Sequence, residues 1–260
     1  MKDIKTNSIG FIGAFRITRI FLQALQNKNL SFEKVLVFDT NKEIIERLKE
    51  NFAEIEKAES ATEAARQSIV FIALHPPIIM EMLDQIKDIV NKNTTVISLA
   101  PKITIEKIAA KLTTGNIMRM IPNAASFINE GFNPVTFGAN FNKEGKSVVM
   151  ELIRTLGDTF EVAEEKLEAY AILSAMLPTY FWFQWNELTK IGTGMGLTEN
   201  ESRSSILKTI DAASHLMFES GLTPEQVMDL IPVKPIGEYE DQIKEIYQSK
   251  LTGLYEKIKP

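Results

Sequence analysis

The first segment that could do chemistry is residues 9–18, where a β-rich run is followed by a glycine turn and an amphipathic stretch. A dinucleotide-binding turn has the pattern G-x-G-x-x-G after a strand, because the glycines allow a tight turn, close approach of the pyrophosphate and helix packing. Anchored on Gly13, the second glycine position holds Phe15 and the third holds Thr18. Backbone amides at the start of the helix can still bind an anion, and Arg16 adds positive charge. The segment therefore indicates a dinucleotide turn, with an ordinary tight turn as the alternative.

A carboxylate follows the second β-rich run of the chain. Asp39 lies 26 residues after Gly13, close to the spacing at which an acidic residue binds the adenosine ribose diol. Asp39 would repel a 2′-phosphate, which favours NAD, whereas Thr40, Asn41 and Lys42 could accommodate one. The choice between NAD and NADP as cofactor therefore stays open. The alternative role for Asp39 is to cap the helix that follows.

Two further turns, at residues 73–77 and 98–102, follow the third and fourth β-rich runs. Ligands of open α/β sheets bind beyond the carboxyl ends of the strands, so these turns are expected to line the same crevice. His75 is a candidate proton donor, because imidazole is the side chain best suited to proton transfer near neutral pH. The alternative is a loop histidine beside the cofactor or in water. The residues expected to contact the dinucleotide are Gly13, Ala14, Phe15, Arg16, Ile17, Asp39, Thr40, Asn41, Leu74, His75, Pro76 and Ala100.

A third kind of candidate is an amide side chain after the fifth β-rich run, which ends in Pro-Asn. Asn123 can both donate and accept hydrogen bonds, as a ligand site requires. A turn-forming asparagine after proline is the alternative interpretation.

These residues must be positioned by alternating strands and helices. Strands are expected at residues 9–12, 35–38, 69–74, 95–99, 116–120 and 135–138, with amphipathic stretches at residues 17–26, 42–51, 78–90 and 103–112. Strands about 25 to 35 residues apart with helices between them are typical of βαβ units and a parallel sheet. After Lys146 the β pattern disappears, and helices are expected at residues 147–157, 163–192, 199–221, 224–231 and 238–258. The sequence therefore predicts an α/β fold, with an N-terminal Rossmann-type doubly wound parallel sheet over residues 1–160 and an all-α domain over residues 161–260.

Composition narrows the function classes. The 260 residues carry a net charge of −5, which argues against a nucleic-acid or anionic-membrane binder. The chain has no cysteine, which excludes disulfides and thiol catalysis, and its two histidines argue against a histidine-rich metal site. The charged start lacks the apolar segment of a signal peptide, and the apolar stretch at residues 167–185 is interrupted. We expect a soluble cytoplasmic protein that holds no metal and binds neither nucleic acid nor membrane.

The order of these motifs resembles the pyrroline-5-carboxylate reductase family. The first strand of family members, similar to Phe-Ile-Gly-x-Gly-Asn-Met, resembles residues 11–17, Phe-Ile-Gly-Ala-Phe-Arg-Ile. Their Lys-Pro turn is similar to His75-Pro76, and their Arg-x-Met-Pro-Asn segment resembles residues 119–123. Three later motifs, Glu-Lys-Leu-Asp, Ser-Gly-Ser-Gly-Pro-Ala-Tyr and Gly-Val-x-x-Gly-Leu, are similar to residues 165–168, 174–180 and 192–197. The order and spacing hold over nearly the whole chain.

The resemblance implies reduction of a cyclic imine, pyrroline-5-carboxylate, to proline by hydride transfer from NAD(P)H. It places the substrate at a dimer interface of the helical domain, where a Ser-Pro-Gly-Gly-x-Thr loop similar to residues 234–239 holds the substrate carboxylate. Tyr239 or His75 could donate a hydrogen bond to the imine nitrogen as the catalytic group. The expected substrate-binding residues are Asn123, Ser174, Met176, Pro178, Thr179, Gly237, Glu238 and Tyr239.

The departures from the family pattern fall at the positions that contact ligands. Tyr239 stands at the threonine position, and Glu238 brings negative charge beside the substrate carboxylate unless Lys234 neutralises it. Met176 and Leu177 replace a serine and a glycine. Two interpretations follow: an oxidoreductase for an altered, bulkier or less polar imine or carbonyl substrate, or a non-catalytic regulatory or interaction protein on the same dimeric scaffold.

One stretch of the helical region is apolar on nearly every face of its helix. Its large side chains are Leu173, Met176, Leu177, Tyr180, Phe181, Trp182, Phe183 and Trp185. A helix that is apolar all round must be enclosed, and this region has few helices to enclose it. We therefore expect a homodimer with interlocked C-terminal helices, and an aromatic stripe for a bound cofactor is the alternative.

Overall fold

The computed structural model describes residues 7–260, so the start of the chain, on which the expectation about a signal peptide rests, lies outside the described residues. The chain divides into two compact units. The first comprises Met1–Ala175 with Tyr255–Pro260, and the second comprises Met176–Leu254. The sequence placed the division near residue 160, whereas the structure divides the chain between Ala175 and Met176.

The first unit is built on one eight-stranded sheet. Its strands are β1 (Ser8–Ile12), β2 (Lys34–Phe38), β3 (Glu56–Lys57), β4 (Ile69–Ile72), β5 (Thr95–Ser98), β6 (Ile117–Met120), β7 (Gly131–Phe137) and β8 (Gly157–Glu161). They lie in the order β3-β2-β1-β4-β5-β6-β7-β8, and only the β6–β7 pair is antiparallel. The chain therefore moves outward from β1 in both directions, which confirms the predicted Rossmann-type α/β sheet.

Helices cover both faces of this sheet. They are α1 (Arg16–Asn27), α2 (Lys42–Lys49), α3 (Ala61–Ala64), α4 (Pro76–Ile86), α5 (Ile105–Ala109) and α6 (Lys143–Arg154). Alternate strand residues enter two separate cores: Phe11 and Phe71 stack in one, with ring centroids 4.8 Å apart, whereas Ile12 and Ile72 lie in the other. Because side chains alternate across a strand, these cores lie on opposite faces of the sheet. Each fully buried side chain of this size contributes about 1.5–3 kcal/mol relative to exposure.

The strand β8 was not expected, because no β pattern was found after Lys146. It is a five-residue edge strand with only Thr159 buried, so it carries no continuous apolar run. It pairs in parallel with β7, where Gly131 faces Gly157. A Cβ on Gly157 would lie 2.2 Å from the Gly131 carbonyl oxygen, and its φ is +136°. Two glycines thus permit a pairing that periodicity does not show.

The single helix expected at residues 163–192 is interrupted. A 3₁₀ turn η3 (Glu164–Lys166), the short helix α7 (Leu167–Tyr170) and a π turn η4 (Ala171–Ala175) belong to the sheet unit. The helical unit then begins with α8 (Leu177–Gly194), which has Pro178 in its first turn, where a proline costs no helical hydrogen bond. The helix prediction over residues 163–192 was therefore correct in type but wrong in continuity.

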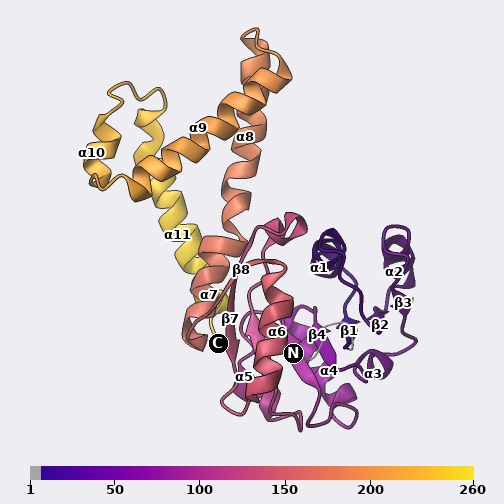
Figure 1. The fold of residues 1–260 in the computed structure, drawn as a ribbon. Helices are drawn as coiled ribbons and strands as arrows, with labels where there is room; N and C mark the ends of the chain where they lie inside the picture. The colour runs from indigo at the N-terminus through magenta and orange to yellow at the C-terminus, as the bar shows by residue number, and fades with distance from the viewer. Residues whose placement is uncertain (1–6) are drawn as a thin grey trace. The chain divides into compact units, whose positions relative to one another are not determined.

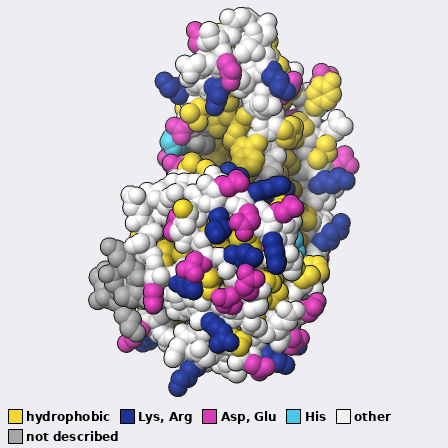
Figure 2. All heavy atoms as spheres, turned by 90° about the vertical axis from the view of Figure 1, so that its right-hand side faces the viewer, with side chains coloured by type: hydrophobic (Ala, Val, Ile, Leu, Met, Phe, Trp, Pro, Cys, Tyr) yellow, Lys and Arg dark blue, Asp and Glu magenta, His cyan; other side chains and the backbone are white. Residues whose placement is uncertain are grey.

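The helical unit contains α8, α9 (Glu199–Glu219), α10 (Pro224–Asp229), the 3₁₀ turn η5 (Gly237–Tyr239) and most of α11 (Glu240–Ile258) (Figure 1). Thr198 begins α9 with a capping box to Glu201, which satisfies amides of the first turn. Large apolar side chains stay exposed here, and they gather in the upper half of Figure 2. Within residues 7–260, no helix has both the length and the apolar character needed to cross a membrane.

Candidate functional site

The turn after β1 is built around Gly13. Its φ is +105°, and a Cβ there would lie 2.4 Å from the Ala73 carbonyl oxygen, so only glycine fits. The Gly13 amide donates to the Phe38 carbonyl at 2.8 Å. The buried Thr18 hydroxyl donates to the Gly13 carbonyl at 2.6 Å. Thr18 therefore fastens α1 to the turn at the position where the dinucleotide pattern has its third glycine.

An aromatic side chain that is half exposed stands at the second glycine position. Phe15 is the residue that precedes α1, and its side chain is 49% exposed. The Arg16 guanidinium lies over the Phe15 ring, 4.9 Å from its centroid, as in a cation–π contact. No side chain caps the first turn of α1. The amides at the start of α1 therefore keep the capacity to bind an anion.

Asp39 is held by the same turn. Its Oδ2 accepts from the Ala14 amide at 2.8 Å, and its Oδ1 accepts from the Asn41 amide at 2.9 Å. The cap of α2 is Asn41, whose side chain accepts from the Glu43 amide at 3.1 Å. The alternative that Asp39 caps this helix is therefore wrong. Two backbone amides fix the carboxylate beside the glycine turn.

The structure brings the predicted turns together at one edge of the sheet. The strands β2, β1 and β4 are neighbours, so the turns that follow them lie side by side (Figure 1). The Leu74 side chain lies 3.2 Å from the Cβ position built on Gly13. His75 is exposed at the start of α4 and makes no side-chain cap, while Pro76 is the first residue of that helix. The remaining expected contacts are Ile17, which packs against the core, the exposed Thr40 and the buried Ala100.

Two of the expected substrate residues meet in the sheet unit. The buried Asn123 side chain donates to the Ser174 carbonyl at 3.3 Å and accepts from the Ala125 amide at 2.9 Å. The Ser174 hydroxyl donates to the Tyr170 carbonyl at 2.6 Å. Asn123 thus caps the 3₁₀ turn Ala124–Ile128, which is consistent with the turn-forming alternative, and it also contacts the π turn η4 through Ser174. Such turns occur often at functional sites.

The other expected substrate residues belong to the helical unit. Met176, Pro178 and Thr179 lie at the start of α8, and the Thr179 hydroxyl donates to the Met176 carbonyl at 2.7 Å. The turn η5 carries Gly237 together with the exposed residues Glu238 and Tyr239. Nearby on α8 and α11, the rings of Tyr180 and Tyr247 lie 6.1 Å apart. Burial raises the pKa of the Tyr180 phenol, and Tyr247 adds to this effect.

The sequence did not reveal a charge cluster that contacts the turn between β5 and α5. Arg119, on β6, is fully buried, and its guanidinium donates to Glu164 at 2.7 Å and to Glu168 at 2.5 Å. The signal was present, because an arginine inside the apolar run Ile-Met-Arg-Met requires a buried partner. Two glutamates four residues apart on a helical segment could have supplied it.

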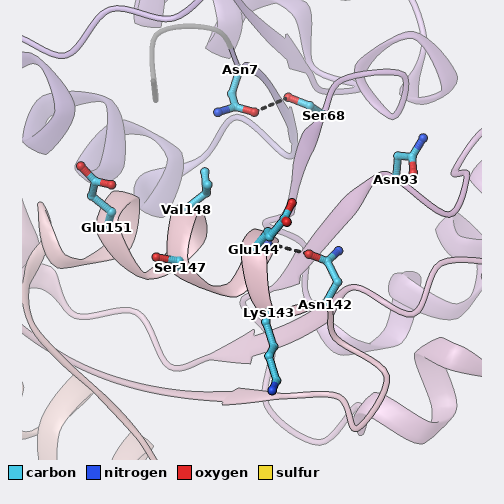
Figure 3. A pocket seen from close by; sticks show the side chains of 10 residues that line it. Asn7, Ser68, Asn93, Asn142, Lys143, Glu144, Ser147, Val148 and Glu151 are labelled. Atoms are coloured by element: carbon cyan, nitrogen blue, oxygen red, sulfur yellow. Dashed lines mark hydrogen bonds between the residues drawn. The ribbon is translucent and has the colours of Figure 1, made fainter. Parts of the chain in front are cut away.

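A large cavity lies elsewhere in the sheet unit. It measures about 970 Å³, and its lining includes Asn7, Ser68, Asn142, Lys143 and Glu144 (Figure 3). Asn7 and Ser68 precede β1 and β4, so this cavity adjoins the amino ends of the parallel strands. Ligands of such sheets bind at the carboxyl ends. In the described part of the chain, no cluster of three or more histidine, aspartate or glutamate side chains could hold a metal ion.

The sheet order, the glycine turn and the acidic residue after β2 define the architecture of NAD(P)-dependent oxidoreductases. The profile of the family described as NADP oxidoreductase coenzyme F420-dependent matches residues 8–102. Pyrroline-5-carboxylate reductase of Corynebacterium melassecola is 24% identical over 252 residues, which are 95% of this chain and 93% of that protein. The Escherichia coli K12 enzyme of the same name is 24% identical over 226 residues, 86% of this chain and 84% of that protein.

Solved structures agree with these relatives. The crystal structure of Plasmodium falciparum pyrroline carboxylate reductase with NADP bound superposes on this chain with a TM-score of 0.74 at 20% identity. The superposition covers 98% of this chain and 95% of the Plasmodium falciparum chain. Together, the motifs and the relatives show that this chain is similar, at a distance and along nearly its full length, to the pyrroline-5-carboxylate reductases. This confirms the resemblance that the sequence motifs indicated.

Proposed function

We propose that this protein is an NAD(P)H-dependent reductase of the C=N bond of a cyclic imine, with pyrroline-5-carboxylate as the first substrate to test. The observation that carries the proposal is the retained turn, in which Gly13 permits the tight backbone contact with Ala73 and Asp39 accepts from the Ala14 amide. A bound nicotinamide supplies the hydride, while the protein contributes binding and orientation. An imine that arrives protonated needs no strong acid from the protein, so the scarcity of histidine is no obstacle.

The residues present fit a dinucleotide. The uncapped first turn of α1 offers amides to a pyrophosphate, and Arg16 offers a positive charge. Phe15 is 49% exposed, so its side chain is not packed into the core and can move when a ligand binds. Asp39 offers acceptors for ribose hydroxyls, with Thr40 and Asn41 beside it.

The experiment is a fluorescence titration of the full chain with NADH and with NADPH. Binding of either nucleotide supports the proposal, and the absence of binding of both at millimolar concentration overturns it. Where binding occurs, proline-dependent reduction of NAD(P) at high pH tests the substrate.

A second candidate function is a non-catalytic interaction protein on the same scaffold. The observation that favours it is the set of departures in the substrate loops, where Glu238, Tyr239 and Met176 stand. A chain that still forms the homodimer but binds neither nucleotide at millimolar concentration is the result expected from this candidate.

Replacing Asp39 with alanine separates the two nucleotides. The variant is expected to bind NADH about 10- to 150-fold more weakly, because a hydrogen bond from a hydroxyl to a charged acceptor is worth about 1.5–3 kcal/mol. NADPH affinity is expected to stay unchanged or rise, because the carboxylate repels a 2′-phosphate. The measurement is the pair of dissociation constants on one preparation, so each nucleotide is the control for the other. Equal losses for both would contradict a role at the ribose.

Replacing Phe15 with glycine tests the direction in which the ring points. We expect the affinity for either nucleotide to change by less than about threefold, because the Phe15 side chain is half exposed and glycine is well tolerated before a helix. The measurement is the same titration. A large gain in affinity would show that the aromatic ring blocks the pyrophosphate.

The expected homodimer is retained as part of the proposal, with the helical unit as its interface. Support comes from the exposed apolar side chains on α8 and α9, among them Trp182 at 50%, Phe183 at 67% and Leu207 at 71%. Sedimentation is expected to give a dimer for the natural chain and a smaller species for Phe183→Glu. The polar substitution Lys190→Gln on the same helix is the matched control. A natural chain that sediments as a monomer would contradict the dimer.

A further inference from the structure

The loop between β5 and α5, residues 99–104, lies at the carboxyl edge of the sheet and contains Ala100, one of the expected dinucleotide contacts. It turns sharply, because Lys102 has a φ of +72°, in the left-handed region that a lysine rarely adopts. A loop with such a backbone needs hydrogen-bond partners that hold it in this conformation.

The partners are one guanidinium and its two carboxylates. Glu168 Oε1 accepts from the Lys102 amide at 3.0 Å, and Glu164 Oε1 accepts from the Ile105 amide at 2.7 Å. The Arg119 guanidinium donates to both of these oxygens and also to the Ala100 carbonyl at 3.4 Å. Three backbone groups of the β5–α5 connection are thus bound to a single buried cluster.

A gain in the stability of the fold does not by itself explain why charged side chains occupy these three positions. Buried ion pairs often add little to stability, because desolvation offsets their attraction. Among the described residues, Arg119 Nε and Glu168 Oε2 are buried without a hydrogen-bond partner, as is the hydroxyl of Ser98, the register neighbour of Arg119. Unpaired buried polar atoms carry a free-energy cost. What the charges provide is a pair of fixed acceptors for loop amides that no strand or helix satisfies.

We propose that Arg119, Glu164 and Glu168 are positioning residues that fix the β5–α5 loop as one wall of the dinucleotide crevice. This inference rests on the proposed function for its ligand. None of the three touches the cofactor; they act through the backbone of Ala100, Lys102 and Ile105. A loop held in advance binds its ligand without an ordering cost, whereas a loosened loop must be ordered during binding.

The test uses the full chain and two variants, Glu164→Gln and Glu168→Gln, which keep shape and remove charge. Glu164 is 29% exposed, so its variant is the one most able to fold. Hydrogen exchange by NMR is expected to show faster exchange of the Lys102 and Ile105 amides in the variants, with the amides of β1 and β4 unchanged. The affinity for NADH or NADPH is expected to fall about tenfold in the folded variants. Asp84→Asn, which breaks the exposed pair with Lys111, is the control and is expected to leave exchange and affinity unchanged.

The outcomes separate this inference from the proposed function. Natural protein that binds neither nucleotide overturns the proposed function, and the positioning role with it, whatever the exchange data show. Natural protein that binds a nucleotide, with folded variants of equal affinity, overturns the positioning role alone. Unchanged exchange at Lys102 and Ile105 in Glu164→Gln does the same. Faster exchange at these amides together with weaker binding supports the inference.

Discussion

Replacing Arg119 with methionine is expected to lower the free energy of unfolding by about 3–5 kcal/mol, the range found when one partner of a buried ion pair is removed. The substitution leaves the Glu168 carboxylate, 1% exposed, without its counter-ion. Methionine fills much the same space, so the loss is electrostatic rather than a cavity. Urea denaturation at neutral pH, with an unchanged slope, is the measurement.

A double variant makes this prediction specific. Arg119→Met with Glu168→Met removes the buried charge together with its partner, and it is expected to recover part of the lost stability, because apolar pairs often replace buried ion pairs without loss. Full recovery is not expected, because the Lys102 amide loses its acceptor. Glu164 remains partly exposed and can reach water. Lys111→Met, at an exposed ion pair, is expected to leave the free energy of unfolding nearly unchanged. A small loss in Arg119→Met would show that the guanidinium contributes little to the fold.

The sheet could be predicted because its central strands are buried on both faces and therefore read as continuous apolar runs. The strands β1, β2, β4, β5 and β6 all fall at expected positions. The edge strand β8 could not be found in this way, since one face is open and only Thr159 is buried. The sequence pattern also could not show that the helix expected after residue 163 is interrupted. The π turn η4 contacts Asn123, which is distant in sequence.

The candidate site was predictable as a set of turns but not as a set of contacts. Spacing placed Gly13 and Asp39 at neighbouring strand ends, because parallel strands share one carboxyl edge. It could not show that Asp39 accepts from the Ala14 amide, since that bond depends on the path of the backbone after β2. Nor could it show that Thr18 binds the Gly13 carbonyl in place of a third glycine. A pattern of residue types indicates which positions lie near the candidate site, whereas the hydrogen-bond partners of those positions depend on the tertiary structure.

Replacing Gly13 with alanine is expected to destabilise the protein and to abolish nucleotide binding. A non-glycine residue at a strained backbone position such as φ +105° costs about 1–3 kcal/mol. The added Cβ, 2.4 Å from the Ala73 carbonyl oxygen, must also push β1 and β4 apart at their carboxyl ends. That movement carries Ala14 away from Asp39 and disturbs the amides at the start of α1. The measurements are thermal unfolding and the titration with NADH and NADPH.

The matched control for this substitution is Gly253→Ala in α11. A Cβ at Gly253 meets nothing within 4 Å, so alanine is expected to stabilise the helix by about 0.5–1 kcal/mol. The addition of one methyl group is therefore expected to lower the stability of the protein at Gly13 and to raise it at Gly253. If Gly13→Ala kept both the unfolding temperature and the nucleotide affinity of the natural chain, the turn would not be the rigid element on which the proposed cofactor site depends. The loss of affinity in a variant that still folds is the result that ties the turn to the ligand.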